Sequence, residues 1–163
     1  MDYHLAQARA AASGGRAGAR CSVAESVEGL ARTLRRLHAD RGLTIDVNVP
    51  ADRAVRGQRE DVDEMLGNLL DNACKWARSR VRVSSTLDGR LVLIDVDDDG
   101  AGLDESMRVR VLQRGVRADE AAPGSGFGLA IVSDLATAYG GSIALDRSPG
   151  GGVRARLILP STM

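Results

Sequence analysis

The stretch GNLLDNACKWA, residues 67–77, is the segment on which our prediction of the fold depends. At about 100° per residue, a helix places Asn68, Asn72 and Lys75 on one narrow face. Apolar residues at three- and four-residue spacing occupy an adjacent arc of about 140°, so the segment is predicted to be a helix packed on a core. These apolar positions are Val62, Met65, Leu66, Leu69, Leu70, Ala73, Trp76 and Ala77.

The polar face of this helix carries two amides and one ammonium group. An amide oxygen can ligate a hard divalent cation without adding charge, and an ammonium group complements phosphate oxygens. Lys75 is the only lysine among the 22 basic residues. The face therefore indicates a magnesium–nucleotide ligand, although this helix taken alone is equally compatible with a solvated surface.

Length and composition limit the possible functions. A chain of 163 residues fits one domain with a real core. With 22 basic and 22 acidic residues, there is no general basic field for nucleic acid. No apolar run approaches the roughly 18 residues that span a bilayer, and no signal peptide is visible, so the chain is expected to be soluble and cytoplasmic. Cys21 and Cys74 are too few for a disulfide framework and are expected to be reduced.

Hydrophobic periodicity predicts an alternation of helices and strands from residue 22 onward. Ser22 is a plausible N-cap with Glu25 at the capping-box position, and Asp88-Gly89 is the strongest hairpin signal. Helices are expected at 22–42, 59–78, 105–112 and 127–139. Strands are expected at 43–49, 81–87, 91–97, 142–146 and 153–159, with a brief extended piece near Val55. The predicted fold is an α/β (α+β) two-layer sandwich, in which a mixed, mostly antiparallel sheet of about five strands packs on three helices.

The turn DDGAGL follows the strand expected at 91–97. Its alternate glycines, Gly100 and Gly102, let the backbone approach a flat ligand closely, and the Asp98 carboxylate can accept a hydrogen bond from an exocyclic amine such as that of adenine. The spacing does not fit a calcium-binding EF-hand loop. A simple glycine-rich turn remains compatible with this pattern.

A second glycine-rich turn, PGSGFGLA, precedes the helix expected at 127–139; its glycines are Gly124, Gly126 and Gly128. Glycines that lead into a helix offer backbone N–H groups and a positive dipole end to phosphate. The turn fits neither the dinucleotide fingerprint nor a P-loop. Arg114 and Arg117, upstream of it, could reach a terminal phosphate, and each is equally compatible with a solvated loop charge.

Together, the Asn-bearing helix, the DxGxG turn and the GxGxGLA turn, in that order, resemble the catalytic ATP-binding domain (HATPase_c, Bergerat or GHKL fold) of bacterial two-component sensor histidine kinases over roughly residues 22–160. The RG-x-R arrangement at 114–117 and the DNACK core most resemble the PhoQ-type subgroup. The resemblance implies that ATP or ADP and Mg²⁺ bind here. It assigns Asn68 and Asn72 to the metal, and Asn68, Lys75, Arg114 and Arg117 to catalysis. It assigns nucleotide binding to Asn68, Asn72, Lys75, Trp76, Asp98, Gly100, Gly102, Leu103, Gly124, Gly126, Phe127, Gly128 and Leu129.

The chain departs from the family pattern in two informative ways. Trp76 stands where the family usually has tyrosine, so it keeps an aromatic face but offers no phenol hydroxyl. Asn68 stands where the ATP-hydrolysing relatives, Hsp90 and gyrase, carry a glutamate. Because an amide cannot act as a general base, this favours phosphoryl transfer to a protein nucleophile over hydrolysis.

The resemblance also implies partners. His4 and His38 are not followed by an acidic residue, so the phosphoacceptor histidine is expected on a dimerisation domain outside this chain. Residues 1–20 resemble the end of the dimerisation helix and a linker, with the catalytic domain at 21–163. The implied parent is a homodimeric inner-membrane sensor that signals to a response regulator, and the isolated fragment is expected to be monomeric. Two alternatives stay open: a nucleotide-responsive non-catalytic binding module, and an anti-sigma-type serine kinase of the same superfamily.

Overall fold

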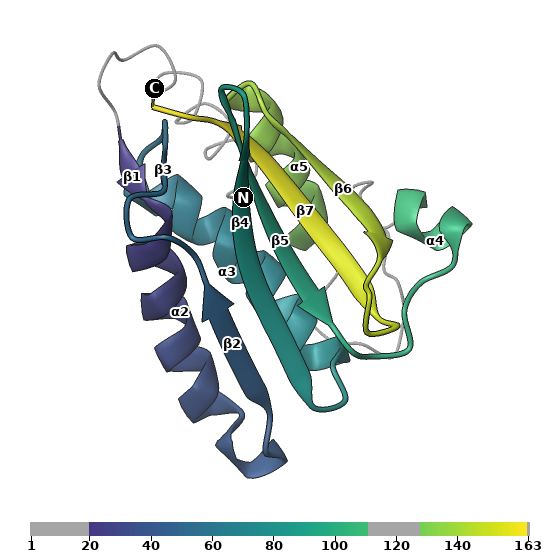
Figure 1. The fold of residues 1–163 in the computed structure, drawn as a ribbon. Coiled ribbons are helices and arrows are strands. Elements are labelled where there is room, and N and C mark those ends of the chain that lie inside the picture. Colours follow the sequence, from purple (N-terminus) through teal and green to yellow (C-terminus); the bar gives the residue numbers. More distant parts are fainter. Residues whose placement is uncertain (1–19, 111–127, 163) are drawn as a thin grey trace.

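The structure, a computed structural model, describes residues 20–110 and 128–162. Its main feature is a five-stranded sheet in the order β2-β4-β5-β7-β6 (Figure 1). The strands are β2 (Thr44–Asn48), β4 (Arg80–Asp88), β5 (Leu91–Asp98), β6 (Ser142–Arg147) and β7 (Val153–Pro160). The helices are α2 (Val23–Leu37), α3 (Arg59–Trp76), α4 (Glu105–Arg110) and α5 (Gly128–Ala138), with a 3₁₀ turn η1 (Ala39–Arg41).

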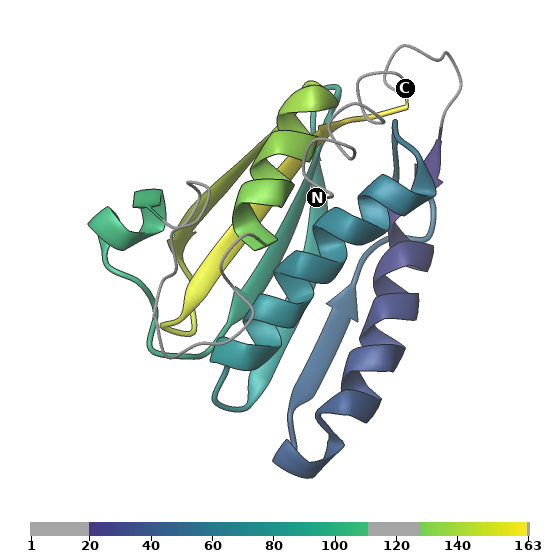
Figure 2. The ribbon, with the colours of Figure 1, turned by 180° about the vertical axis from the view of Figure 1, so that it is seen from behind.

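The pairing within the sheet confirms the predicted fold class. β2 runs parallel to β4, whereas β4–β5, β5–β7 and β6–β7 are antiparallel. Helices α2, α3 and α5 cover one face of the sheet, as the view from behind shows (Figure 2). Strand residues alternate between the two faces. Val92, Ile94 and Val96 of β5 therefore point into the core beneath the helices, while Asp95 and Asp97 point to the opposite, helix-free face.

The structure confirms the helix cap and the hairpin predicted from local sequence, with small shifts at the ends of elements. The Ser22 side chain accepts a hydrogen bond from the Glu25 backbone N–H at 3.2 Å, so the predicted N-cap is confirmed. The hairpin at Asp88-Gly89 is also confirmed, with Gly89 at φ 62°. The first helix is shorter than predicted, because α2 ends at Leu37 and η1 carries the chain to Gly42.

A second, two-stranded sheet was not predicted. β1 (Cys21–Ser22) pairs antiparallel with β3 (Ala54–Val55), the segment for which the sequence indicated only a brief extended piece. Each strand has two residues, too few for a period-two pattern to show. This small sheet ties the start of α2 to the segment that leads into α3.

Helices α3 and α5 are joined by a buried polar contact as well as by apolar packing. The Tyr139 hydroxyl, at the end of α5, donates to Asp61 Oδ2 at 2.5 Å near the start of α3 and accepts from the Gln58 backbone N–H at 3.3 Å. Asp61 is fully buried. Because the two helices run in opposite directions, this contact anchors the far end of α5 and so fixes where its first residue, Gly128, meets α3.

Both cysteines, and the helices of the described residues, bear on the predictions of reduced thiols and of no membrane span. Cys21 and Cys74 are both buried and free, and burial raises the pKa of each thiol to about 11, so both stay protonated at neutral pH. None of the helices within residues 20–110 and 128–162 combines the length and apolar character needed to cross a bilayer.

Candidate nucleotide site

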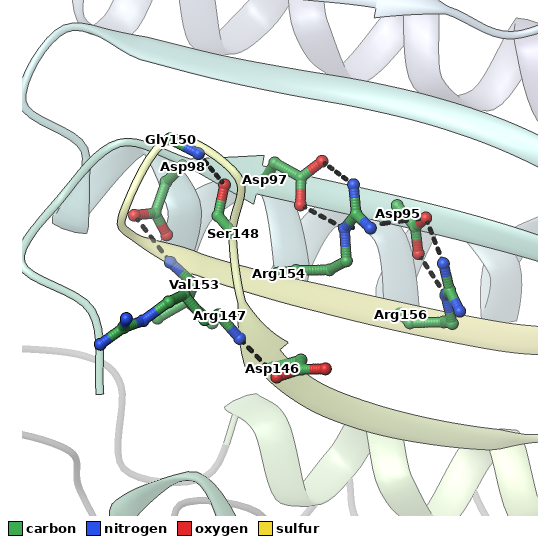
Figure 3. Close-up of polar contacts among 10 residues, drawn as sticks. All are labelled: Asp95, Asp97, Asp98, Asp146, Arg147, Ser148, Gly150, Val153, Arg154 and Arg156. Atoms are coloured by element: carbon green, nitrogen blue, oxygen red, sulfur yellow. Dashed lines mark hydrogen bonds and ion pairs between the residues drawn. The ribbon is translucent and has the colours of Figure 1, made fainter. Parts of the chain in front are cut away.

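Asp98, the last residue of β5, lies at the centre of the site. It is 3% exposed, and its Oδ1 accepts backbone hydrogen bonds from Gly100 at 2.8 Å and from Val153 of β7 at 3.3 Å (Figure 3). Within the described residues, no hydrogen bond is recorded for the other oxygen, Oδ2. The described backbone therefore holds the carboxylate by one oxygen.

The two carboxylates at the end of β5 have opposite electrostatic environments. Burial raises the pKa of the Asp98 carboxyl, and the hydrogen bonds from Gly100 and Val153 offset this only in part. For Asp99, burial also acts to raise the pKa, but the backbone and side-chain donors of Ser79 and the backbone donors of Arg80 and Arg78 hold it well below its usual range. Asp99 thus joins the start of β4 to the turn, while the Asp98 carboxyl keeps a raised pKa.

Close backbone contacts explain the glycines of this turn. A Cβ on Gly100 would overlap the carbonyl oxygen of Trp76 at the end of α3. Gly102 has φ +81°, and a Cβ there would lie 3.0 Å from the Gly151 carbonyl oxygen. The DDGAGL turn is therefore enclosed between the end of α3 and the β6–β7 turn. The protein's own backbone therefore requires both glycines, and their predicted contact with a flat ligand stays a prediction.

Asn68 and Asn72 face the start of α5. A Cβ on Gly128 would lie 3.2 Å from Asn68 Oδ1 and 3.8 Å from Asn72 Nδ2. Asn68 Nδ2 donates to the Glu64 carbonyl oxygen at 2.9 Å, which leaves its Oδ1 directed at α5. Asn72 is 5% exposed, and its buried Nδ2 has no hydrogen-bond partner within the described residues. A buried polar atom without a partner is costly unless a ligand supplies one.

Lys75 and Trp76 have other contacts that bear on their predicted roles. Lys75 Nζ forms an ion pair with Asp71 Oδ2 at 3.0 Å on the same helix, so contact with a phosphate would require it to share or leave this partner. Trp76 and Leu103 are partly buried against the core, and Leu129 is 3% exposed within it. The predicted site residues Arg114, Arg117, Gly124, Gly126 and Phe127 lie outside the described residues.

Two contributors to the site were missed in the sequence. Val153 donates to Asp98, and a Cβ on Gly152 would overlap Asp98 Oδ1, so the β6–β7 turn forms one wall around the carboxylate. The signal was the run of three glycines in SPGGG, more than a hairpin turn needs. Arg41 is the second contributor, since its guanidinium donates to the carbonyl oxygens of Cys74 at 2.6 Å and Ala77 at 2.9 Å and so caps α3 next to Gly100.

The amino-acid sequence is similar to those of known proteins. Residues 57–163 match the model of the family described as "Histidine kinase-, DNA gyrase B-, and HSP90-like ATPase". The sensor protein kinase CarS of Pseudomonas aeruginosa is 45% identical over 143 residues, which cover 88% of this chain and 32% of CarS. The virulence sensor histidine kinase PhoQ of Salmonella typhimurium is 34% identical over 83% of this chain and 28% of PhoQ. The chain thus spans about a third of the length of these relatives.

Solved structures with the same fold include sensor kinases. The mycobacterial sensor histidine kinase MprB has a TM-score of 0.77 at 28% identity, covering 87% of this chain and 96% of that one. A crystal structure of full-length ShkA in complex with AMPPNP has a TM-score of 0.73 at 27% identity and covers 98% of this chain and 35% of ShkA. Both similarities extend well beyond the three sequence motifs.

Proposed function

The chain belongs to the family of histidine kinase-, DNA gyrase B- and HSP90-like ATPases, and from this premise we propose that it is the Mg·ATP-binding catalytic domain of a sensor histidine kinase. It donates the γ-phosphate of ATP to a histidine on a dimerisation domain. The observation that carries this proposal is Asp98, a nearly buried carboxylate whose Oδ1 is held by backbone donors, while its Oδ2 has no hydrogen bond from residues 20–110 or 128–162. That arrangement suits an adenine amine.

At the base end, Asp98 Oδ2 accepts a hydrogen bond from the exocyclic amine of adenine. Burial raises the pKa of the Asp98 carboxyl, so its ionised form is less well solvated than a surface carboxylate, and a ligand donor would stabilise it. Gly100 and Gly102 let the turn pack against the end of α3 and the β6–β7 turn, which keeps the backbone beside Asp98 in place for a base. ShkA, the structural relative solved with AMPPNP, supports a nucleotide as the occupant.

At the phosphate end, Asn68, Asn72 and the first turn of α5 form the binding surface. The amide oxygens can hold Mg²⁺, which when bound neutralises the charge that develops on the transferring phosphoryl group. The buried Nδ2 of Asn72, which has no hydrogen-bond partner among residues 20–110 and 128–162, supports a polar ligand at this position. The N–H groups that open α5 lack intrahelical acceptors and favour phosphate oxygens. Lys75, Arg114 and Arg117 are proposed to add positive charge there.

The chemistry proposed is transfer rather than hydrolysis. Asn68 cannot accept a proton from water, and its Nδ2 is already committed to the Glu64 carbonyl oxygen. Positioning and charge neutralisation therefore supply the catalysis, and the nucleophile comes from a partner protein. The relatives CarS and PhoQ are named as sensor kinases, which supports a histidine as the acceptor and a response regulator downstream. A homodimeric membrane-bound parent, with residues 1–20 leading from its dimerisation helix, completes the proposal.

Transfer to a separate dimerisation domain tests this function. The isolated chain is incubated with Mg·ATP labelled at the γ-phosphate and with the dimerisation domain of the parent kinase. We expect label that is lost in acid and retained in base, as phosphohistidine is. Acid-stable phosphoserine on another substrate would instead identify the serine-kinase alternative, and tight ATP binding without any transfer would identify a non-catalytic binding module.

The raised pKa of Asp98 predicts a pH dependence. The native state holds this proton more tightly than the unfolded chain, so between the ordinary value of 3.8 and the raised value the unliganded domain loses stability as pH rises. ATP needs the ionised carboxylate, so its affinity should fall as pH drops through the same window, by up to about tenfold per unit. Calorimetry over a pH series from 7.5 down toward the ordinary value of 3.8 measures this. Purine riboside triphosphate, which lacks only the exocyclic amine, is the control for phosphate titration and should show a smaller change.

A further inference from the structure

Two matched ion pairs join β5 to β7 on the helix-free face of the sheet. Arg154 donates to Asp97 through Nε at 2.8 Å and Nη2 at 3.1 Å, and Arg156 donates to Asp95 in the same way at 2.7 Å and 2.9 Å (Figure 3). Each pair joins residues directly opposite in the strand register. Both aspartate side chains are 10% exposed. The pairs are also connected, because Arg154 Nε lies 3.8 Å from Asp95 Oδ2, a longer contact than either pair makes within itself.

The two pairs differ in their distance from Asp98. Asp97 precedes Asp98 directly, and Arg154 follows Val153, whose N–H donates to Asp98. Asp97 and Asp98 point to opposite faces of the sheet because consecutive strand residues alternate. The Asp97–Arg154 pair thus ties β5 to β7 behind the same backbone that holds the Asp98 carboxylate in front, whereas the Asp95–Arg156 pair lies two residues farther away along both strands.

Close packing of the β6–β7 turn makes the contact between Asp98 and the start of β7 sensitive to small movements of the backbone. Gly152 is packed so closely on Asp98 that a single Cβ there would overlap both Oδ1 and the backbone carbonyl oxygen. The Val153 hydrogen bond to Oδ1 is 3.3 Å long, so it has little room to lengthen before it is lost. If the start of β7 moves away, Oδ1 loses this donor and the carboxylate can rotate. Oδ2 would then no longer point where the amine binds.

We propose that Asp97 and Arg154 are positioning residues for nucleotide selection: their ion pair holds the start of β7 against Asp98 and keeps Oδ2 directed at the adenine amine. This inference rests on the proposed role of Asp98 in binding adenine. Asp97 touches no nucleotide and acts from the opposite face of the sheet. The Asp95–Arg156 pair contributes chiefly to stability, since its one ion-pair contact with the Asp97–Arg154 pair, among the described residues, is the 3.8 Å contact between Asp95 and Arg154.

The matched pairs supply the experiment. Asp97→Asn removes the carboxylate that accepts both Arg154 hydrogen bonds, whereas Asp95→Asn removes the partner of Arg156 and only the 3.8 Å contact to Arg154. Thermal melting should show a loss of stability in both variants. In calorimetry at pH 7.5, Asp97→Asn should weaken ATP binding about tenfold, the scale seen when a residue that orients a ligand group is removed. Asp95→Asn should change it less than about twofold. Purine riboside triphosphate has no exocyclic amine to bond to Asp98, so its affinity should be nearly unchanged in both variants.

Arg154→Lys and Arg156→Lys form a milder second comparison, because lysine keeps the charge but not the paired contacts. Again only the variant at position 154 should reduce the preference for ATP over purine riboside triphosphate. Equal ATP losses at positions 97 and 95, or equal losses of both nucleotides in Asp97→Asn, would overturn the proposal. Asp98→Asn distinguishes failure of the proposed nucleotide site from failure of the positioning role. If this variant binds ATP normally, the proposed site itself is wrong. If it loses ATP binding but Asp97→Asn and Asp95→Asn have equal ATP affinities, only the positioning role fails.

Discussion

Asp98→Asn is expected to lose ATP binding while the domain keeps its fold. Asparagine is nearly the same size, and its Oδ1 can still accept from Gly100 and Val153. Its Nδ2 then occupies the place of the free carboxylate oxygen and presents a donor to the donor amine of adenine. A lost charged hydrogen bond and a donor facing a donor together cost about 3 kcal/mol or more, which is over 100-fold in affinity. Isothermal titration calorimetry with ATP measures this.

Stability and a second nucleotide separate this effect from general damage. Because burial raises the pKa of Asp98, removing its charge should leave the melting temperature of the unliganded domain unchanged or higher. Purine riboside triphosphate should bind the variant about as well as it binds the wild-type domain, so the preference for ATP disappears. Undiminished ATP affinity would show that Asp98 does not contact the base.

Asn72→Ala is expected to abolish the effect of Mg²⁺ on ATP binding. In the wild-type domain, Mg²⁺ should increase ATP affinity, because an amide oxygen of the site can ligate it. The variant should bind ATP equally in Mg²⁺ and in EDTA, at about the wild-type EDTA affinity. The change in the presence of Mg²⁺ should be about tenfold or more, as is usual when a group that holds a metal is removed. Paired titrations in the two buffers measure it.

The same substitution should not destabilise the unliganded domain. Asn72 Nδ2 is buried without a partner in the described residues, so alanine removes an unmet donor as well as a small volume. Asn48→Ala, at the exposed last residue of β2, is the control and should leave both stability and Mg²⁺ dependence unchanged. If Asn72→Ala reduced ATP affinity by the same factor with and without Mg²⁺, the metal role would be wrong and a direct contact with nucleotide would replace it.

Much of the fold could be predicted because its determinants are local. The helix at 59–78, the hairpin at Asp88-Gly89 and the N-cap at Ser22 depend on periodicity, turn residues and capping within a few positions, and the structure has all three. The position of α5 against α3 could not be predicted in this way, because the Tyr139–Asp61 contact joins residues far apart in the chain. Neither could the β1–β3 pair, whose strands are too short to show a pattern.

The sequence by itself determined the family and the candidate residues for its chemistry. The order of motifs and the helical face of Asn68 and Asn72 identified the family, since spacing along one element is a local property. Tertiary structure decided which other residues surround these candidates. β5 lies next to β7 in the sheet, and only this neighbourhood brings Val153 and Gly152 to Asp98 and Arg154 to Asp97. Strand order depends on how the whole chain buries its apolar faces, so no local pattern could show which oxygen of Asp98 stays free.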